Sequence, residues 1–427
     1  MSEANSRLIS LDVFRGMTIA GMVLVNNPGS WSHIYAPLEH AEWNGLTPTD
    51  WIFPFFLFIV GVAIPIALSK RIAEGITGKV YRKIVSRAAA IYLLGAAISI
   101  IPFFSFSSTD APDWEKMLIW LVFSAALYFL MLRNYKLTII LTAVGVVGVI
   151  AMYLAGYSVG GYNFGTLRIF GVLQRIAVCY LITSIIFLHT TWKQQLGITS
   201  FNDKACNLAA WLDRTILTED HIWRQAKVYD PEGLLSTIPA IVTTIAGVLT
   251  GTWLMRRDKG HLTVDETSDQ SLVDRYSSLD KVAGMFFAGV VLLAIGFIWN
   301  SYFPINKSLW TSSFVCATAG LALLTLGSCY WLIDIKGYKT WARPFVIFGA
   351  NALALFVFTG LFARMIGAYH VTGADGKPTS IQQWIFDNVF SVVLQPIDAS
   401  LAFAICFILL WLFLMWLLYR KQIYIKV

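Results

Sequence analysis

Charged residues are scarce in this chain of 427 residues, where Asp, Glu, Lys and Arg together make up only 13%. Soluble globular domains carry roughly 25% charged residues, so the composition excludes an ordinary water-soluble protein. Cysteine is sparse as well, and the five residues form neither a disulfide framework nor a CxxC metal motif. The six histidines show no HxxxH or HxH spacing, so the sequence does not indicate a metal site.

Apolar residues account for 57% of the chain. They recur in stretches close to the roughly 20 residues that cross a bilayer as a helix. We therefore predict an all-α polytopic transmembrane bundle of about 10 or 11 spans with short loops, forming a single domain over residues 1–427. The expected spans are Leu11–Tyr35, Asp50–Leu68, Arg87–Phe104, Met117–Leu132, Leu137–Gly156, Gly171–His189, Leu234–Met255, Val282–Trp299, Thr311–Ile333, Pro344–Tyr369 and Leu401–Tyr419.

Lysine and arginine near the span ends predict the orientation, because cytoplasmic loops are enriched in these residues. The basic segment 70–87, the loop of about 256–281 and the pair Arg420 and Lys421 are expected on the cytoplasmic side. The loop of about 191–231 and His40 then fall on the extracytoplasmic side, with both termini cytoplasmic.

Eleven spans would place the two termini on opposite sides of the membrane, which conflicts with this orientation. One segment between residues 134 and 230 is therefore expected to be re-entrant, broken or not a span. The net charge of +7 is explained by the cytoplasmic lysines and arginines. Nucleic-acid binding is not indicated, because no basic–aromatic motif accompanies that charge.

The segment His40–Asp50 places a titratable imidazole among polar residues between two long apolar runs. A polar cluster in that position is costly unless it lines a cavity or faces water, so it indicates a functional site. Histidine can accept and return a proton near neutral pH. We expect Asp50 to orient His40 if the loop folds back on its helix. His33 is interpreted as an ordinary surface residue.

Asn26 and Asn27 precede Pro28 and Gly29, which break the first span and free backbone groups that need partners. Either the asparagine side chains cap those groups, or Asn26 orients a reacting carbonyl or fixes the tautomer of His40. Both interpretations are kept.

Three arginines enter apolar surroundings. Arg15 follows Asp12 by three residues, so the two can pair on one helical face. Arg15 is then either a membrane anchor or a cation for a phosphate-bearing ligand. Arg168 and Arg175 are seven apart and are expected to share one helical face. There they would pair with acids of neighbouring helices, or their guanidinium groups would bind a phosphate or a carboxylate.

Two later segments have simple structural interpretations. Residues 230–232, Asp-Pro-Glu, are typical of a helix start, where proline fits the first turn and acids oppose the helix dipole favourably. Lys307 and Trp310 are typical of an interfacial anchor.

Short motifs in a fixed order run along nearly the whole chain: Asp12–Gly16, Val25-Asn26, His40–Asp50, Phe53-Pro54, Gly171–Arg175, Asp213-Arg214, His221, Asp230–Gly233, Asn306-Lys307, Leu309-Trp310 and Asn351. In these motifs the chain resembles the heparan-α-glucosaminide N-acetyltransferase family of membrane acyltransferases. The resemblance is to its bacterial branch, which lacks the long N-terminal lumenal domain of the animal enzymes.

The resemblance implies an enzyme of the bacterial cytoplasmic (inner) membrane that takes an acetyl group from cytoplasmic acetyl-CoA. The acceptor would be the amine of a glucosamine-containing glycan on the extracytoplasmic side. By match of motif, His40 corresponds to the catalytic histidine and Asn26 to a nearby active-site asparagine. Arg15, Arg168 and Arg175 are candidates for the coenzyme phosphates. The family has a span between the Gly171–Arg175 helix and Asp213, whereas residues 192–212 are too polar and short to supply it, which leaves the place of Arg168 and Arg175 open.

We expect His40 to act either as a general base toward the amine or as a nucleophile that carries an acetyl group. Asn26 would polarise the thioester carbonyl. Two alternative functions are kept: an O-acyltransferase of cell-envelope glycan hydroxyls and a proton-coupled transporter, although transporters usually contain internal repeats. The natural acceptor and the oligomeric state stay open, with a homodimer among the options.

Overall fold

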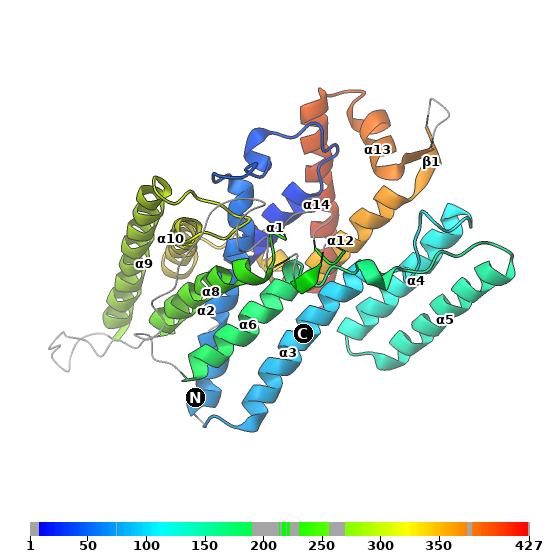
Figure 1. Cartoon of the computed structure of the whole chain (residues 1–427). Helices are drawn as coiled ribbons and strands as arrows, with labels where there is room; N and C mark the ends of the chain where they lie inside the picture. Colours follow the sequence, from blue (N-terminus) through cyan, green and yellow to red (C-terminus); the bar gives the residue numbers. More distant parts are fainter. Residues whose placement is uncertain are drawn as a thin grey trace. The chain divides into compact units, whose positions relative to one another are not determined.

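The computed structural model describes residues 8–73, 75–189, 213, 216–218, 220–222, 230–255, 270–373 and 378–425. Helices dominate this described part of the chain, as Figure 1 shows. A short antiparallel hairpin joins β1 (His370–Thr372) to β2 (Pro378–Ser380). The predicted all-α class is confirmed.

Ten helices in the described residues are long and apolar enough to cross a membrane. They are α1 (Ile9–Asn26), α2 (Ile52–Ala73), α3 (Gly78–Ile100), α4 (Asp113–Met131), α5 (Tyr135–Leu154), α6 (Val172–His189), α8 (Leu234–Met255), α9 (Gln270–Asn300), α10 (Ser312–Cys329) and α14 (Pro396–Arg420). A broken pair, α11 (Arg343–Ala350) and α12 (Ala352–Ala368), brings the number to eleven if it counts as one span. The chain is therefore an integral membrane protein with the predicted number of spans.

Several predicted boundaries were wrong. The first span ends at Asn26 and not at Tyr35, because Pro28 lacks an amide hydrogen and the Asn27 side chain donates to the carbonyl of Val23 at 2.8 Å. The third helix begins at Gly78, so most of the basic segment predicted as a loop is helical. The tenth span is interrupted at Asn351, whose amide contacts the backbone of the C-terminal segment.

The helices form two compact units, each assembled from three stretches of the chain. The first unit comprises residues 1–18, 40–92 and 170–349. The second comprises residues 19–39, 93–169 and 350–427. Most of the predicted extracytoplasmic loop of about 191–231 and most of the cytoplasmic loop of about 256–281 lie outside the described residues.

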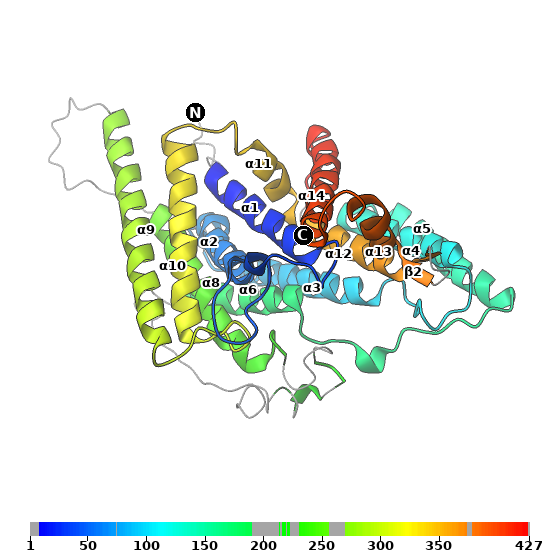
Figure 2. The same cartoon turned by 90° about the horizontal axis from the view of Figure 1, so that it is seen from above.

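Within the first unit, α2 packs along α8 and α9 packs along α10, as Figures 1 and 2 show. Glycine makes the first of these contacts close, because a Cβ on Gly61 would lie 1.9 Å from the carbonyl oxygen of Thr244. A Cβ on Gly247 would lie 2.1 Å from the carbonyl oxygen of Phe58. Small residues allow such backbone approach between membrane helices.

In the second unit, α4 and α5 pack together, and most side chains of α5 are exposed, as expected for a lipid-facing helix. The buried ammonium of Lys116 holds the segment before α4 in place. It donates to the carbonyls of Phe106 at 3.2 Å and Thr109 at 3.1 Å and lies 2.7 Å from the Asp113 carboxylate. A cation with this set of partners needs no bound ligand.

Candidate active site

His40 and Asp50 are in contact, with His40 Nδ1 at 2.7 Å from Asp50 Oδ1. Asp50 is buried in the 3₁₀ turn η2 (Pro48–Trp51) that leads into α2. Its second oxygen accepts from the amides of Ala41 and Thr47 at 3.2 and 3.1 Å and from the Thr47 hydroxyl at 2.9 Å. The loop therefore folds back on its helix, and three donors hold the carboxylate that orients the imidazole.

This contact decides the tautomer of His40. An ionised carboxylate can only accept, so Nδ1 carries the hydrogen and donates it to Asp50. Nε2 then carries the lone pair. The His40 side chain is 53% exposed, so a substrate can reach that nitrogen. The arrangement suits a general base or a nucleophile.

Lys307 completes the cluster from the turn between α9 and α10. Its Nζ lies 2.9 Å from His40 Nδ1, 3.3 Å from His40 Nε2 and 3.3 Å from Asp50 Oδ1. Because Nδ1 donates to Asp50, the ammonium is left to donate to Asp50 or to Nε2. Burial lowers the pKa of Lys307, while the charges of Asp50 and Glu232 act in the opposite direction. Sequence reasoning interpreted Lys307 only as an anchor and missed this contact.

Buried polar contacts tie the His40 loop to the Lys307 turn. Asn306 is fully buried, and its amide donates to the Asn44 side chain at 3.1 Å. The amide of Gly45 donates to the carbonyl of Ile305 at 2.8 Å. Gly45 has a φ of +128°, a conformation that favours glycine. In the sequence, the Asn306-Lys307 motif was the signal that this turn could take part in the site.

Arg175 lies behind the cluster and is completely buried. Its guanidinium lies over the rings of Trp310 at 5.1 Å and Phe53 at 5.9 Å. It donates to the hydroxyl of Ser236 and to the carbonyl of Gly233. These contacts are with rings, a hydroxyl and a carbonyl, so they do not test the pairing with acids that the sequence predicted. The role of Arg175 in binding a coenzyme phosphate stays a prediction.

The other two arginines differ in their placement. Arg15 donates to Asp12 at 3.1 Å, as predicted, and keeps 29% of its side chain exposed. Arg168 lies in a non-helical stretch after the 3₁₀ turn η3 (Phe164–Thr166). The predicted shared helical face of Arg168 and Arg175 was wrong, because α6 begins only at Val172.

Asn26 is the exposed last residue of α1 and belongs to the second unit. The capping role expected for the asparagines falls to Asn27, which contacts Val23. The active-site role of Asn26 stays a prediction.

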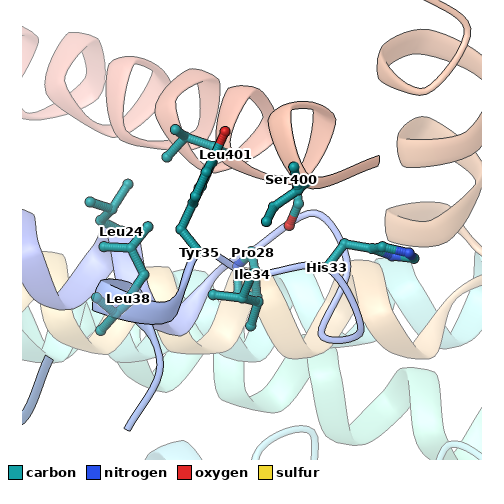
Figure 3. Close-up of a pocket in the computed structure, with 11 residues that line it drawn as sticks. Leu24, Pro28, His33, Ile34, Tyr35, Leu38, Ser400 and Leu401 are labelled. Atoms are coloured by element: carbon teal, nitrogen blue, oxygen red, sulfur yellow. The ribbon is translucent and has the colours of Figure 1, made fainter. Parts of the chain in front are cut away.

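A small pocket lies in the second unit, between α14 and the segment after α1 (Figure 3). Its lining is mostly apolar, and Figure 3 shows the His33 ring directed away from it. The Tyr35 hydroxyl donates to Asp398 at 2.5 Å. No residue of the His40 cluster lines this pocket, so it is not the candidate active site.

The fold and the site define a polytopic α-helical membrane protein with a His–Asp–Lys cluster on its loops. The chain is similar to heparan-alpha-glucosaminide N-acetyltransferase of Homo sapiens, with 23% identity over 491 aligned residues that cover 100% of this chain and 61% of the human protein. The same protein of Mus musculus is 24% identical over 419 residues, covering 83% of this chain and 53% of the mouse protein. A family described as a domain of unknown function, DUF5009, matches residues 7–210.

These similarities confirm the resemblance that the motifs indicated. The chain spans 61% and 53% of the length of these two relatives. The activity in their names belongs to longer proteins, so its transfer to this chain is treated as a proposal below.

Proposed function

We propose that this chain is a membrane-embedded acetyltransferase that moves the acetyl group of acetyl-CoA to the amine of a glucosamine-containing glycan. One observation carries the proposal: His40 is oriented by a buried carboxylate at 2.7 Å and is still half exposed. A histidine in that setting can exchange protons with a bound substrate near neutral pH. The similarity to named N-acetyltransferases supports the choice of reaction.

The residues of the cluster suggest a division of roles. His40 Nε2 takes a proton from the acceptor amine as the amine nitrogen attacks the acetyl carbonyl carbon. The C–N bond forms, the C–S bond breaks, and His40 returns the proton to the departing thiolate. Asp50 stabilises the imidazolium in between. Lys307 carries a positive charge beside Nε2, where it would stabilise the negative charge that develops on the carbonyl oxygen or the thiolate.

A second route uses His40 as the nucleophile. Nε2 would attack the thioester and hold the acetyl group until the amine accepts it. Incubation with acetyl-CoA in the absence of an acceptor, followed by mass spectrometry, distinguishes the routes. Acetyl on His40 supports the nucleophilic route, and unmodified His40 supports direct transfer.

The proposal also includes the geometry of the membrane. We assign acetyl-CoA to the cytoplasmic side and the glycan to the extracytoplasmic side of a bacterial inner membrane, with both termini cytoplasmic. A bilayer core of about 30 Å is too costly for the coenzyme phosphates to cross, so they would stay at cytoplasmic cations. Arg15 is the first candidate because its side chain is partly exposed, and the half-buried Arg168 and the buried Arg175 are further candidates. Asn26 is assigned to polarising the thioester carbonyl.

The test is acetyl transfer from labelled acetyl-CoA to glucosamine in inside-out and right-side-out vesicles. We compare the wild type with His40→Ala and with His33→Ala, which removes an exposed histidine outside the cluster. Transfer that requires acetyl-CoA on the cytoplasmic face and disappears only in His40→Ala is expected.

Equal activity in wild type and His40→Ala would refute the catalytic role of His40. Transfer to hydroxyl-only glycans instead of glucosamine would identify an O-acyltransferase. Flux of a solute without consumption of acetyl-CoA would identify a transporter.

A further inference from the structure

Lys307 brings a primary amine into the candidate active site, on a turn that is fixed by buried hydrogen bonds. The Asn306 side chain accepts from the amide of Leu309 at 2.9 Å, and the amide of Asn306 donates to the Thr311 hydroxyl at 3.0 Å. The carbonyl of Lys307 accepts from the amide of Trp310 at 3.1 Å. The backbone that carries the lysine side chain is therefore held in one conformation, while 23% of that side chain stays exposed.

The Lys307 amine lies within proton-transfer distance of the proposed base. Its Nζ is 3.3 Å from His40 Nε2, the nitrogen that carries the lone pair. The buried Lys116 offers a contrast, because its ammonium is held by two carbonyls and by the Asp113 carboxylate. Those partners do not take up a proton near neutral pH, whereas an imidazole does. The ammonium of Lys307 therefore has a route by which it can become a neutral amine.

This amine belongs to the same chemical class as the amine of the proposed acceptor. Because most of the Lys307 side chain is shielded from water, its pKa lies below that of an ordinary lysine, although the charges of Asp50 and Glu232 act in the opposite direction. The ammonium gives up a proton more readily than that of an exposed lysine. An acetyl group delivered to His40 then meets a nucleophile of the protein itself whenever the acceptor is absent.

We infer that Lys307 is a self-acetylation site: its amine takes the acetyl group when no acceptor amine occupies the site, and the acetylated protein is inactive. The inference rests on the proposed acetyl transfer and adds a form of regulation to the same site. Acetylation removes the positive charge that Lys307 holds beside His40 and Asp50. An amide is far less reactive than a thioester, so this acetyl group is not passed on to the glycan.

Self-acetylation of Lys307 conserves atoms and charge. The ammonium passes one proton to His40 Nε2 and becomes a nucleophilic amine. Its nitrogen attacks the acetyl carbonyl carbon of acetyl-CoA, the C–N bond forms and the C–S bond breaks. His40 returns its proton to the departing thiolate, takes the second proton from the nitrogen and releases it to solvent. The products are an acetylated lysine, the coenzyme thiol and one proton.

The test follows acetylation of individual lysines by mass spectrometry in the purified full-length protein in lipid nanodiscs, with labelled acetyl-CoA in excess. Without an acceptor, label should accumulate on Lys307, and added glucosamine should suppress it. In His40→Ala the rate of labelling at Lys307 should fall by about 10²-fold or more, the usual contribution of a general base. The exposed Lys336 reports direct chemical acetylation. Neither glucosamine nor His40→Ala should change the rate there.

Loss of activity provides a second measurement that needs no variant of His40. Preincubation of the wild type with acetyl-CoA should lower the subsequent transfer to glucosamine in proportion to the acetylated fraction of Lys307. Lys307→Arg has no amine to acetylate at this position and should keep whatever activity it has before preincubation. Lys336→Arg is the matched control and should lose activity as the wild type does.

Three outcomes would contradict these expectations. Unlabelled Lys307 in a preparation that acetylates glucosamine would overturn the inference and leave the proposed function standing. Equal labelling of Lys307 in wild type and His40→Ala would also overturn the inference, because the lysine would then react without the site. A wild type that acetylates neither glucosamine nor Lys307 would overturn both the inference and the proposed function.

Discussion

At the scale of single residues, Asp50 has two structural tasks. Its Oδ2 forms a reciprocal capping box with Thr47 at the start of the turn that leads into α2. Its Oδ1 orients His40. The cap holds the Asp50 carboxylate in one position, because one of its oxygens is bonded to the backbone of Thr47. The other oxygen is thereby held where it contacts the imidazole. The two tasks can be separated by mutation.

Asp50→Asn is expected to lower the rate of acetyl transfer by about 10²–10⁴, because an amide can favour the wrong imidazole tautomer. Thr47→Ala removes only part of the cap and should cost about 1 kcal/mol of stability with much of the activity retained. The measurements are the transfer rate and thermal unfolding in detergent. Equal losses of activity in both variants would show that Asp50 acts through stability alone.

Lys307 predicts a pH dependence. Its pKa lies below that of an ordinary lysine because most of the side chain is shielded from water. The ammonium is therefore present at low pH and is lost as pH rises through this lowered pKa, so activity that needs the cation should fall at alkaline pH. In Lys307→Arg the arginine stays charged at any pH of the assay. The fall in activity on the alkaline side of the pH–rate profile should therefore move to higher pH. If activity falls at the same pH in both proteins, the alkaline loss of activity comes from a titratable group other than Lys307. Lys336→Arg, which changes an exposed lysine outside the His40 cluster in the same way, serves as the control.

At the scale of elements, the contact between α2 and α8 holds the site together. One helix follows the turn that holds Asp50, and the other begins just after Gly233, whose carbonyl accepts from Arg175. The distance between their backbones is set by Gly61 and Gly247, where any Cβ would collide with backbone atoms. Backbone cannot move aside as a flexible side chain can, so this contact tolerates little change.

Gly247→Ala is expected to separate the two helices and to cost about 1–3 kcal/mol of stability. Activity should fall as well, since the two ends of the site move apart. Gly78→Ala is the matched control, because a Cβ there meets no atom within 4 Å. Thermal unfolding and acetyl transfer are measured for both. A Gly247→Ala protein as stable and active as the control would show that the helices adjust freely.

At the scale of the whole molecule, the orientation in the membrane rests on the distribution of basic residues. The exposed Glu42 on the His40 loop is predicted to be extracytoplasmic, and the exposed Lys79 at the start of α3 is predicted to be cytoplasmic. Each can be replaced by cysteine in a cysteine-free background and treated with a membrane-impermeant maleimide. Glu42→Cys should react in right-side-out vesicles and Lys79→Cys only in inside-out vesicles. Reaction of both from the same side would refute the predicted topology.

The sequence by itself determined the class of protein and the approximate number of spans, because a run of about 20 apolar residues is a local property. It also indicated the contact between His40 and Asp50, since the two are only ten residues apart on a loop that caps its own helix. Helix boundaries were less predictable, because single residues such as Asn27 and Asn351 decide where a helix ends or breaks. The shared face expected for Arg168 and Arg175 was wrong because Arg168 lies before the start of α6.

Only the tertiary structure decided which distant residues join His40. Lys307 is 267 positions away in the chain, and its turn reaches the His40 loop through the buried contact between Asn44 and Asn306. Charge alone marks a lysine near a span end as an anchor. The structure shows a different role, because the turn before α10 packs near the start of α2 and brings the Lys307 ammonium into contact with the His40 imidazole. The burial of Arg175 under Trp310 and Phe53 likewise depends on helix packing that no local pattern encodes.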